Sequence, residues 1–411
     1  MPKPIVYLIS ILSLTSLSLK SQTVGLEMKS GVDQIEIPFE YKNNFILIDI
    51  IFNNTLPLKF IFDTGAEYTI INKREITDLL GVSYEKEFRL LGSDMTTELI
   101  AYLCRGVNID LNELHGSKQD ILVLAEDYFR IEEFTGIDVH GILGANFFKR
   151  YIIKIDYRKR VIQFIKPEIF NSPNKDYHEV PARFTKNKPY VLCQTQIIAD
   201  TILPLSMLID SGASLALLIH TNSNRQINLP KTTIEGQLGM GLGGFLTGFL
   251  GRTHLLELNN KLAFQNVITS FQKITELNDT THMNGRNGVI GNLLLSRFTV
   301  MIDYPREKVY LKPRKKYNRG FKYDKSGLGI IASGSDFNEF IVTNVVKGSP
   351  ADLAGVQKGD QILRLNLLSS SFYSLSHLTS ILQGRDGKKI RMKIRRNGVK
   401  KKVIFRLKSL I

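Results

Sequence analysis

The chain contains 411 residues, which is long for a single domain and suits two or three. Hydrophobic residues make up 43% and charged residues 23% of it, so disordered and fibrous classes of protein are excluded. The formal net charge of +15 belongs to the C-terminal part, because residues 312–411 hold 22 Lys and Arg against 6 Asp and Glu. We interpret this charge as a solvated cationic surface, with attraction to a membrane surface or an acidic partner as the alternative. Nucleic-acid binding is not expected, because no recognition motif accompanies the charge.

The first residues are typical of a signal peptide. Lys3 precedes an apolar run from Ile5 to Leu19, which is shorter than the roughly 20 residues that span a bilayer. We therefore expect residues 1–22 to be removed on export to the periplasm or the cell exterior, with an uncleaved membrane anchor as the alternative. No later segment is apolar for long enough to span, so the mature protein should be soluble or peripheral.

A tetrapeptide near the start of the chain returns 147 positions later. Asp63-Thr64-Gly65-Ala66 matches Asp210-Ser211-Gly212-Ala213, and each copy follows an apolar run. The same offset relates Gly141-Ile142-Leu143-Gly144 to Gly288-Val289-Ile290-Gly291, Arg150 to Arg297, and Ile155-Asp156-Tyr157 to Ile302-Asp303-Tyr304. A duplication that supplies one acid from each half is what a two-carboxylate site on a pseudo-twofold axis requires.

Asp63 and Asp210 are the candidate catalytic pair. Two carboxyl groups held within hydrogen-bonding distance cannot both ionise cheaply, so they share one proton. The ionised member can take a proton from a water molecule while the protonated member polarises a peptide carbonyl. Glycine lets the backbone turn after each acid, and the hydroxyl between them can bond across the pair. We predict these supporting roles for Thr64, Gly65, Ser211 and Gly212.

The alternative for each motif is a purely structural role. A single Asp-Thr-Gly is common as a turn, but two copies, each followed 81 residues later by a conserved apolar-apolar-Gly pattern within the chain, favour the functional interpretation. Asp156 and Asp303 are also related by the repeat. Each lies in an alternating strand followed by turn residues, so we assign them to the fold.

Short apolar runs broken by turn residues predict a mostly β structure for residues 23–313. Short helices are predicted over residues 72–80 and 145–150. The two cysteines, Cys104 and Cys193, could pair in an exported protein, but we favour free thiols. There is no CxxC or HExxH motif and no ligand spacing among the His residues, so neither a metal site nor a cofactor is predicted.

Two polar segments divide the chain. Residues 167–181, rich in Pro, Asn and charge, predict a linker between one half at 23–166 and the other at 182–313. A second charged linker at 313–319 precedes residues 321–411, which have no counterpart in the repeat and form a third domain.

These features resemble the pepsin/retropepsin clan of aspartic peptidases, in the bacterial retropepsin-like form that carries a C-terminal PDZ domain. The resemblance implies two β-barrel lobes in which each Asp lies on a loop threaded by the later apolar-apolar-Gly strand, with a substrate cleft between the lobes. In the third domain, Ser349-Pro350 predicts a helix start and Gly355 its end. The resemblance assigns Leu328-Gly329-Ile330 to the loop that binds a peptide carboxylate while the peptide adds a strand to the sheet edge.

Members of this family close over substrate with a β-hairpin flap, and each half offers a candidate. The first runs from residue 88 to 100 and lacks the tyrosine of pepsin-like flaps; the second runs from 236 to 251 and contains seven glycines. The flap and substrate-binding candidates are Gly92, Ser93, Asp94, Gly241, Gly243 and Gly244. The second stretch also matches GxGxxG, but the strand-turn-helix context of a dinucleotide site is absent. An apolar hairpin that contacts a membrane or partner is the weaker alternative.

The sequence therefore predicts an exported aspartic endopeptidase that acts on protein or peptide substrates. Both acids come from one chain, so a monomer suffices. The PDZ domain would recruit or gate substrates, or bind the C-terminus of a peptide. A catalytically idle peptide-binding adaptor on the same fold is the main alternative, and a basic protein associated with membrane or nucleic acid is the third hypothesis.

Overall fold

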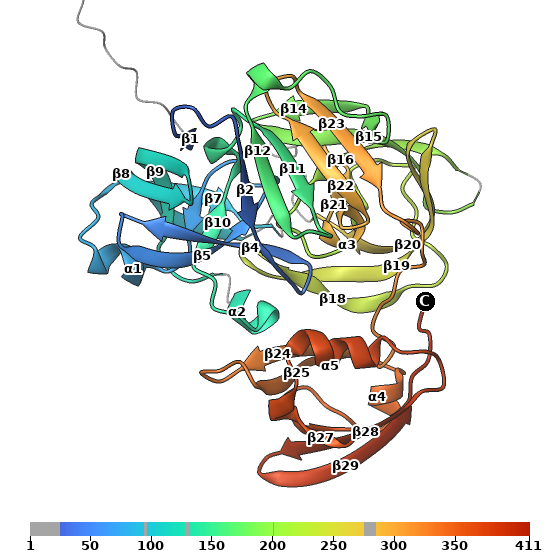
Figure 1. The fold of residues 1–411 in the computed structure, drawn as a ribbon. Coiled ribbons are helices and arrows are strands. Elements are labelled where there is room, and N and C mark those ends of the chain that lie inside the picture. The colour runs from blue at the N-terminus through green and yellow to red at the C-terminus, as the bar shows by residue number, and fades with distance from the viewer. Residues whose placement is uncertain (1–24, 94–96, 129–130, 200, 275–284) are drawn as a thin grey trace, which may run out of the picture.

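The computed structural model describes residues 25–411, apart from 94–96, 129–130, 200 and 275–284. The predicted signal peptide and Asp94 therefore lie outside the described residues. The fold is mostly β, as predicted, with two lobes above a separate C-terminal domain in the view of Figure 1. No helix in the described ranges is both long and apolar enough to cross a membrane.

The first lobe is built on a nine-stranded sheet. Its strands are β1 (Glu27–Met28), β3 (Glu40–Lys42), β4 (Phe45–Phe52), β5 (Leu56–Phe62), β6 (Ile70–Ile71), β7 (Tyr84–Leu91), β8 (Glu98–Leu111), β9 (Leu114–Leu124) and β10 (Gly141–Leu143). They lie in the order β1-β9-β6-β10-β5-β4-β8-β7, with β3 beside β4. Tight turns at Asn43-Asn44 and Asn53-Asn54 bound β4, because Asn tolerates the positive φ that these turns require.

The second lobe repeats this plan with an eight-stranded sheet. Its strands are β14 (Ala182–Thr185), β15 (Lys188–Gln196), β16 (Leu203–Ile209), β17 (Leu217–His220), β18 (Ile234–Gly241), β19 (Gly244–Asn259), β20 (Leu262–Gln272) and β21 (Gly288–Ile290). They lie in the order β14-β15-β16-β21-β17-β20-β19-β18. β16 and β21 correspond to β5 and β10 of the first lobe, at the offset of the sequence repeat.

Six further strands form a sheet that both halves share. They are β2 (Gln34–Pro38), β11 (Ile152–Asp156), β12 (Val161–Ile165), β13 (His178–Val180), β22 (Phe298–Asp303) and β23 (Lys308–Pro313). At its centre β11 pairs antiparallel with β22, and Lys154 lies opposite Met301, the residue 147 positions later. The pseudo-twofold axis therefore passes between these two strands. β13 lies within the predicted linker at 167–181, which is thus partly a strand, because it pairs with β23.

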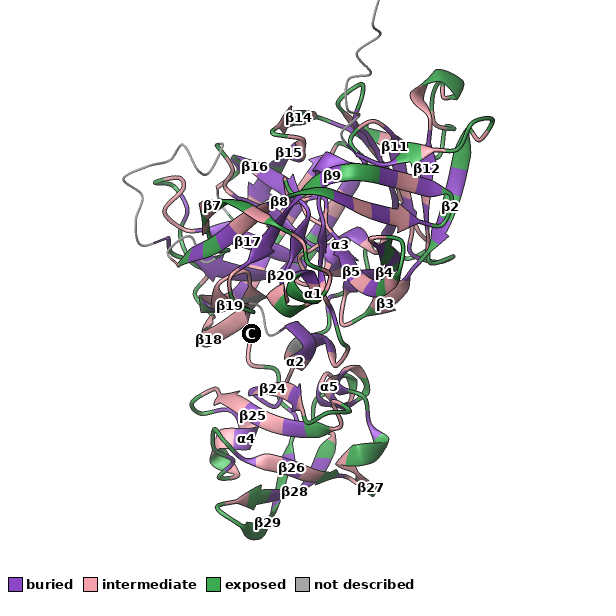
Figure 2. Ribbon diagram, turned by 90° about the vertical axis from the view of Figure 1, so that its left-hand side faces the viewer, coloured by how far each residue is buried: buried purple, intermediate pink, exposed green. Residues whose placement is uncertain are grey.

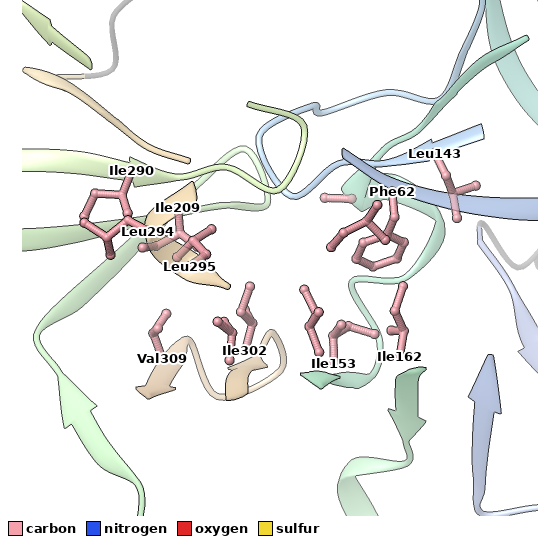
Figure 3. Close-up of a cluster of buried hydrophobic side chains, with 14 of the residues drawn as sticks. Phe62, Leu143, Ile153, Ile162, Ile209, Ile290, Leu294, Leu295, Ile302 and Val309 are labelled. Atoms are coloured by element: carbon pink, nitrogen blue, oxygen red, sulfur yellow. The ribbon is translucent and has the colours of Figure 1, made fainter. Parts of the chain in front are cut away.

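One hydrophobic core runs through both lobes. Figure 3 shows repeat counterparts on its two sides: Phe62 and Leu143 face Ile209 and Ile290 across the centre. These four side chains are at most 1% exposed, and burying one such side chain contributes about 1.5–3 kcal/mol. The same core holds both strands that end in the repeated Asp residues, so the two acids are anchored in one body.

The short helices differ in length from their predictions. The helix predicted over 72–80 is α1 (Arg74–Leu79), and the one predicted over 145–150 is a single 3₁₀ turn, η1 (Ala145–Phe147). Among the described residues, the remaining helical segments of the two lobes are α2 (Ile131–Thr135), η2 (Pro167–Ile169) and α3 (Asn292–Leu295). Cys104 in β8 and Cys193 in β15 are buried and free.

The C-terminal domain has its own core and a six-stranded sheet. Its elements are β24 (Leu328–Ser333), β25 (Glu339–Val345), α4 (Pro350–Leu353), β26 (Gln361–Leu365), β27 (Leu368–Ser369), η4 (Ser370–Phe372), α5 (Leu375–Leu382), β28 (Lys389–Arg396) and β29 (Val399–Arg406). The predicted N-cap is present, because the Ser349 hydroxyl accepts the Asp352 amide at 3.3 Å. Figure 2 shows the buried faces of this domain separated from those of the lobes, with α2 between them.

Candidate active site

Each repeated acid stands at the end of a strand that a later strand clamps in place. β10 runs parallel to β5 and antiparallel to β6, and its Leu143 carbonyl accepts the Asp63 amide at 3.1 Å. β21 lies in the same way between β16 and β17, and its Ile290 carbonyl accepts the Asp210 amide at 3.0 Å. The threaded loops expected from the sequence are therefore present in both lobes.

The two carboxyl groups face each other across the pseudo-twofold axis. The Gly65 amide donates to Asp63 Oδ1 at 2.7 Å, and the Gly212 amide donates to Asp210 Oδ1 at 2.8 Å. A Cβ on Gly65 would lie 2.6 Å from Cγ of Asp210, and one on Gly212 would overlap the Asp63 carboxyl group. Each lobe's glycine therefore makes room for the acid of the other lobe.

The hydroxyls of Thr64 and Ser211 bond across the axis, as predicted. Each backbone amide donates to the other residue's hydroxyl oxygen at 3.0 Å. Each hydroxyl then donates onward at 2.8 Å, from Thr64 to the Ile209 carbonyl and from Ser211 to the Phe62 carbonyl. All four bonds are buried, so this network fixes the distance between the two acids.

Burial raises the pKa of both acids, although they remain partly accessible from the cleft. The pKa of Asp63 lies well above its ordinary value because burial is reinforced by the negative charge of Asp210. The rise for Asp210 is opposed by its hydrogen bond with Asp63 and by the positive charge of Arg286. The pair therefore holds one proton between its two carboxyl groups.

Two β-hairpins, one from each lobe, meet above the acids. β7 and β8 turn at Gly92 and Ser93, and β18 and β19 turn at Leu242 and Gly243. The Ser93 amide donates to the Leu242 carbonyl at 2.5 Å, and the Leu242 amide donates to Ser93 Oγ at 3.0 Å. Gly241 lies against Ser93 so closely that a Cβ would lie 2.5 Å from the serine Cβ. Both predicted flaps are hairpins, although the first begins earlier, at Tyr84.

The hairpin also settles the GxGxxG alternative. Gly239 and Gly241 lie in β18 and Gly244 begins β19, so the motif lies on antiparallel strands and not before a helix. The context of a dinucleotide site is therefore missing. In the described ranges no group of three or more His, Cys, Asp and Glu side chains is arranged to hold a metal ion.

Family models match both parts of this architecture. An aspartyl protease model matches residues 48–147, which include Asp63 and its clamping strand, and a PDZ domain model matches residues 341–396. The chain carries an aspartyl protease domain followed by a C-terminal PDZ domain.

Three curated relatives share shorter segments with the chain. The carboxy-terminal processing protease CtpB of Bacillus subtilis (strain 168) is 33% identical over 101 residues, 24% of this chain and 21% of that protein. CtpA of the same organism is 27% identical over 85 residues, 21% and 18% of the two chains. The chloroplastic carboxyl-terminal-processing peptidase 1 of Arabidopsis thaliana is 37% identical over 79 residues, 18% and 16%. The matches thus span about a fifth of the length of each relative.

The cleft between the two lobes has a volume of about 420 Å³ and is lined by both acids and both hairpin tips. Sequence reasoning missed three of its polar residues, Lys188, His220 and Arg286, which come from separate segments of the second lobe. A larger cleft of about 750 Å³ lies where the linker at 313–319 meets the PDZ domain. No acidic side chain lines that cleft, so the carboxylate chemistry belongs to the smaller one.

Asp156 and Asp303 lie in turns, which agrees with the structural role predicted for them. Asp156 accepts the amides of Arg158 and Lys159 at 2.9 and 3.0 Å. Asp303 accepts the amide and the guanidinium of Arg306 at 3.1 and 2.9 Å.

The predicted carboxylate loop of the PDZ domain is partly occupied by the chain itself. The buried carboxylate of Asp324 accepts backbone amides at the start of this loop, and burial raises its pKa to about 6. The donors are the amides of Ser326 (2.9 Å), Gly327 (2.7 Å) and Leu328 (3.3 Å). Gly329 and Ile330 follow in β24, with a bulge between them. A peptide carboxylate at this loop would compete with Asp324 for the Leu328 amide.

Helix α2 of the first lobe packs against both β24 and α5 of the PDZ domain. Asn43 strengthens this contact, because its Nδ2 donates to the Thr135 carbonyl at 2.9 Å and its Oδ1 accepts the Ser376 hydroxyl. At its other end α2 begins with Ile131, which lines the protease cleft. Helix α2 therefore connects the PDZ domain with the cleft.

Proposed function

We propose that the protein is an aspartic endopeptidase. The observation that carries the proposal is the facing pair of Asp63 and Asp210, each held by the amide of its own glycine and each with a raised pKa. A pair that keeps one proton contains both a base and an acid at the same point. Hydrolysis of a peptide bond requires such a pair, because the base takes a proton from the attacking water while the acid protonates the carbonyl oxygen.

In the proposed reaction a water molecule between the acids gives a proton to the Asp210 carboxylate and attacks the peptide carbonyl carbon. Asp63 transfers its proton to the carbonyl oxygen as the tetrahedral intermediate forms. When the C–N bond breaks, Asp210 gives its new proton to the leaving amine, and a hydroxyl of the intermediate returns a proton to Asp63. The pair ends in the one-proton state in which it began.

The geometry around the pair favours an extended peptide as substrate. The cleft lies under two hairpins whose backbone can approach a peptide closely because their tips carry glycine and serine. Both acids belong to one chain, which supports activity as a monomer. The apolar run after Lys3 supports export as the setting in which it works.

We further propose that the PDZ domain binds peptide C-termini, either of substrates or of partners. The names of the relatives refer to processing at a carboxyl terminus. A peptide bound along the edge of β24 would contact helix α2, which packs against that strand and also lines the cleft. Peptide binding at the PDZ domain and access to the cleft would therefore be linked.

The test is cleavage of a peptide library by the purified protein at acidic to neutral pH, with new termini identified by mass spectrometry. Asp63→Asn and Asp210→Asn should each lower cleavage by about 10⁴-fold, because neither variant can hold the shared proton between two carboxylates. Asp156→Asn is the matched control, since that carboxylate only accepts turn amides and an Asn oxygen can replace it.

Cleavage that survives in either active-site variant would refute the proposal. Peptide binding by the wild-type protein without release of new termini would instead support the idle adaptor.

A further inference from the structure

The duplication allows the two walls of the cleft to be compared position by position. β4 and β15 pair with the Asp-bearing strands β5 and β16 in the same register, which makes Phe45 and Lys188 equivalent. β9 and β20 pair with β6 and β17 in the same register, which makes Leu124 and Gln272 equivalent. At both positions an apolar side chain of the first lobe is replaced by a polar one in the second.

The ends of β6 and β17 are matched by hydrogen bonds. Asn72 donates its backbone amide to the His140 carbonyl at 3.0 Å, and His220 donates its amide to the Asn287 carbonyl at 2.8 Å. Asn72 and His220 are therefore equivalent.

The fourth pair of equivalent residues lies two positions before the clamping strands β10 and β21. It is Val139 in the first lobe and Arg286 in the second. The second lobe thus carries Lys188, His220, Gln272 and Arg286 where the first carries Phe45, Asn72, Leu124 and Val139. All four residues of the second lobe line the cleft.

In the first lobe the equivalent positions form a closed apolar cluster. Phe45, Leu124 and Val139 are buried together with Ile131 of α2. The polar member, Asn72, donates its Nδ2 to the carboxylate of Asp127 and to the carbonyl of Val139, both at 3.3 Å, whereas its Oδ1 has no partner among the described residues. This wall offers a substrate an apolar surface.

In the second lobe Lys188 is short of negative charge. Burial is the main cause that lowers the pKa of Lys188, and the charge of Arg286 adds to it. The acids near Lys188 are Glu67 and Asp63, and they raise its pKa by less than these causes lower it. No described carboxylate lies within ion-pairing distance of the Lys188 ammonium.

Arg286 lies close enough to Lys188 for its charge to act on the lysine. Burial lowers the pKa of Arg286, although the neighbouring Asp210 and Tyr190 act in the opposite direction. A further carboxylate between Lys188 and Arg286 would stabilise the charged form of both.

His220 supplies the polar group that is still missing a partner. Its side chain is 1% exposed, and within the described residues neither ring nitrogen has a hydrogen-bond partner. Burial, reinforced by Arg286, lowers the pKa of His220 to about 3, so the ring is neutral and keeps one N–H donor. An unsatisfied buried donor beside Arg286, in a cleft that Lys188 also lines, is the setting in which an acceptor from a ligand is favoured.

We propose that Lys188, His220 and Arg286 form a subsite for an acidic side chain, Asp or Glu, of the peptide substrate. This inference rests on the proposed peptidase function and names its substrate class. The first lobe selects an apolar residue on its side of the scissile bond, and the second lobe selects a carboxylate on the other side. The carboxylate accepts from the ammonium, the guanidinium and the imidazole N–H.

The experiment begins with peptide cleavage by the full wild-type chain. From one cleaved sequence, peptides are made with Glu or Gln at each position on either side of the scissile bond, each as a C-terminal acid and as an amide. One position on one side of the bond should show a kcat/KM for Glu that is about tenfold or more above that for Gln. The preference should be the same for the acid and the amide peptides.

Variants then locate the preference. Lys188→Phe and Arg286→Val copy the first lobe, and each should reduce the ratio of kcat/KM for the Glu peptide to that for the Gln peptide at that position. The ratio is compared, and not the rate alone, because the charge of Arg286 also acts on Asp210. Lys231→Met removes one exposed cation of the same lobe outside the cleft and should keep the full preference. Thermal denaturation of each variant shows whether it is folded.

The outcomes separate this inference from the proposed function. The same Glu and Gln peptides are also titrated by fluorescence anisotropy against Asp63→Asn, which keeps the subsite but lacks one acid. If the wild-type protein releases no termini, the peptidase proposal fails. The Glu and Gln peptides are then made from a library peptide that the Asp63→Asn variant binds, and their anisotropy preference decides the subsite. Equal treatment of Glu and Gln in cleavage and in binding would overturn the inference. A preference only for a free terminal carboxylate, or one that survives in both cleft variants, would overturn it as well.

Discussion

The two lobes share their backbone and their contacts at the pseudo-twofold axis, yet they differ in the side chains that face the cleft. At the axis, Thr64 and Ser211 each donate two hydrogen bonds to the other lobe, one from the backbone amide and one from the hydroxyl, and the two pairs are related by the pseudo-twofold symmetry. Away from it, Phe45 of the first lobe corresponds to Lys188 of the second. The difference shows where a duplicated fold is free to diverge.

The reason is physical. A residue at the axis contacts its own counterpart, so a change on one side leaves a buried donor or acceptor without its partner on the other. A residue on the cleft wall does not contact its own counterpart, so it can change without leaving that counterpart unpaired. Three experiments test this distinction between a shared centre and divergent walls.

The largest effect is expected from the glycines that adjoin the acids. Gly65→Ala and Gly212→Ala each push a methyl group against the carboxyl group of the other lobe, so each should reduce kcat/KM by about 100-fold or more. Gly212→Ala should be the more severe, because its Cβ would come closer to Asp63 than that of Gly65 comes to Asp210. Cleavage of a fluorogenic peptide measures the effect. Gly320→Ala, where a Cβ meets nothing within 4 Å, is the control, and a normal rate in either site variant would break the comparison.

Removing the hydroxyl of Thr64 or of Ser211 should lower the free energy of unfolding by the same amount. Thr64→Val and Ser211→Ala each remove two buried hydrogen bonds and leave a buried amide unsatisfied, so each should lower the free energy of unfolding by about 3 kcal/mol. The double variant should cost less than the sum, because both single changes break the same network. Equilibrium unfolding in urea measures this, with the exposed Thr55→Val as control. Clearly unequal single costs would show that the centre is not symmetric.

The smallest effect is expected in the pH dependence of stability, and it separates the two acids. An acid whose pKa is raised on folding contributes stability at low pH, and this contribution is lost as pH rises through the raised pKa. Asp63 carries the larger rise, so Asp63→Asn should flatten the fall in stability with rising pH more than Asp210→Asn does. Melting temperatures measured at several values between about pH 4 and 7 test this order. A larger effect of Asp210→Asn would place the shared proton on the other lobe.

The repeated motifs carried enough information to predict the centre of the molecule. The repeated tripeptides at Asp63 and Asp210 predicted the facing acids. The family resemblance that they carry, together with the strands before Gly144 and Gly291, implied the clamped loops. The glycines near residue 241 predicted a flap that is now seen to bond with Ser93. Each of these signals is local, because the residues that act together are adjacent in the chain or related by one fixed offset.

The lobe-two wall could not be predicted in the same way. Lys188, His220 and Arg286 come from three segments that only the folded sheet brings together. The offset between equivalent residues is 147 for Val139 and Arg286 but 143 for Phe45 and Lys188, so a single shift of the sequence does not align them. The contact of α2 with the PDZ domain is equally invisible, since it depends on how two separate cores pack.

The two hydrogen bonds between Ser93 and Leu242 join the tips of the two hairpins over the cleft. A continuous polypeptide cannot enter the cleft from the side while the hairpin tips are joined. Both hydrogen bonds must therefore break before such a chain can lie across the acids. A compact domain presents no free strand to such an opening. In the proposed peptidase, breaking these two bonds would therefore be part of every turnover, and an unfolded segment would reach the acids where a compact domain would not.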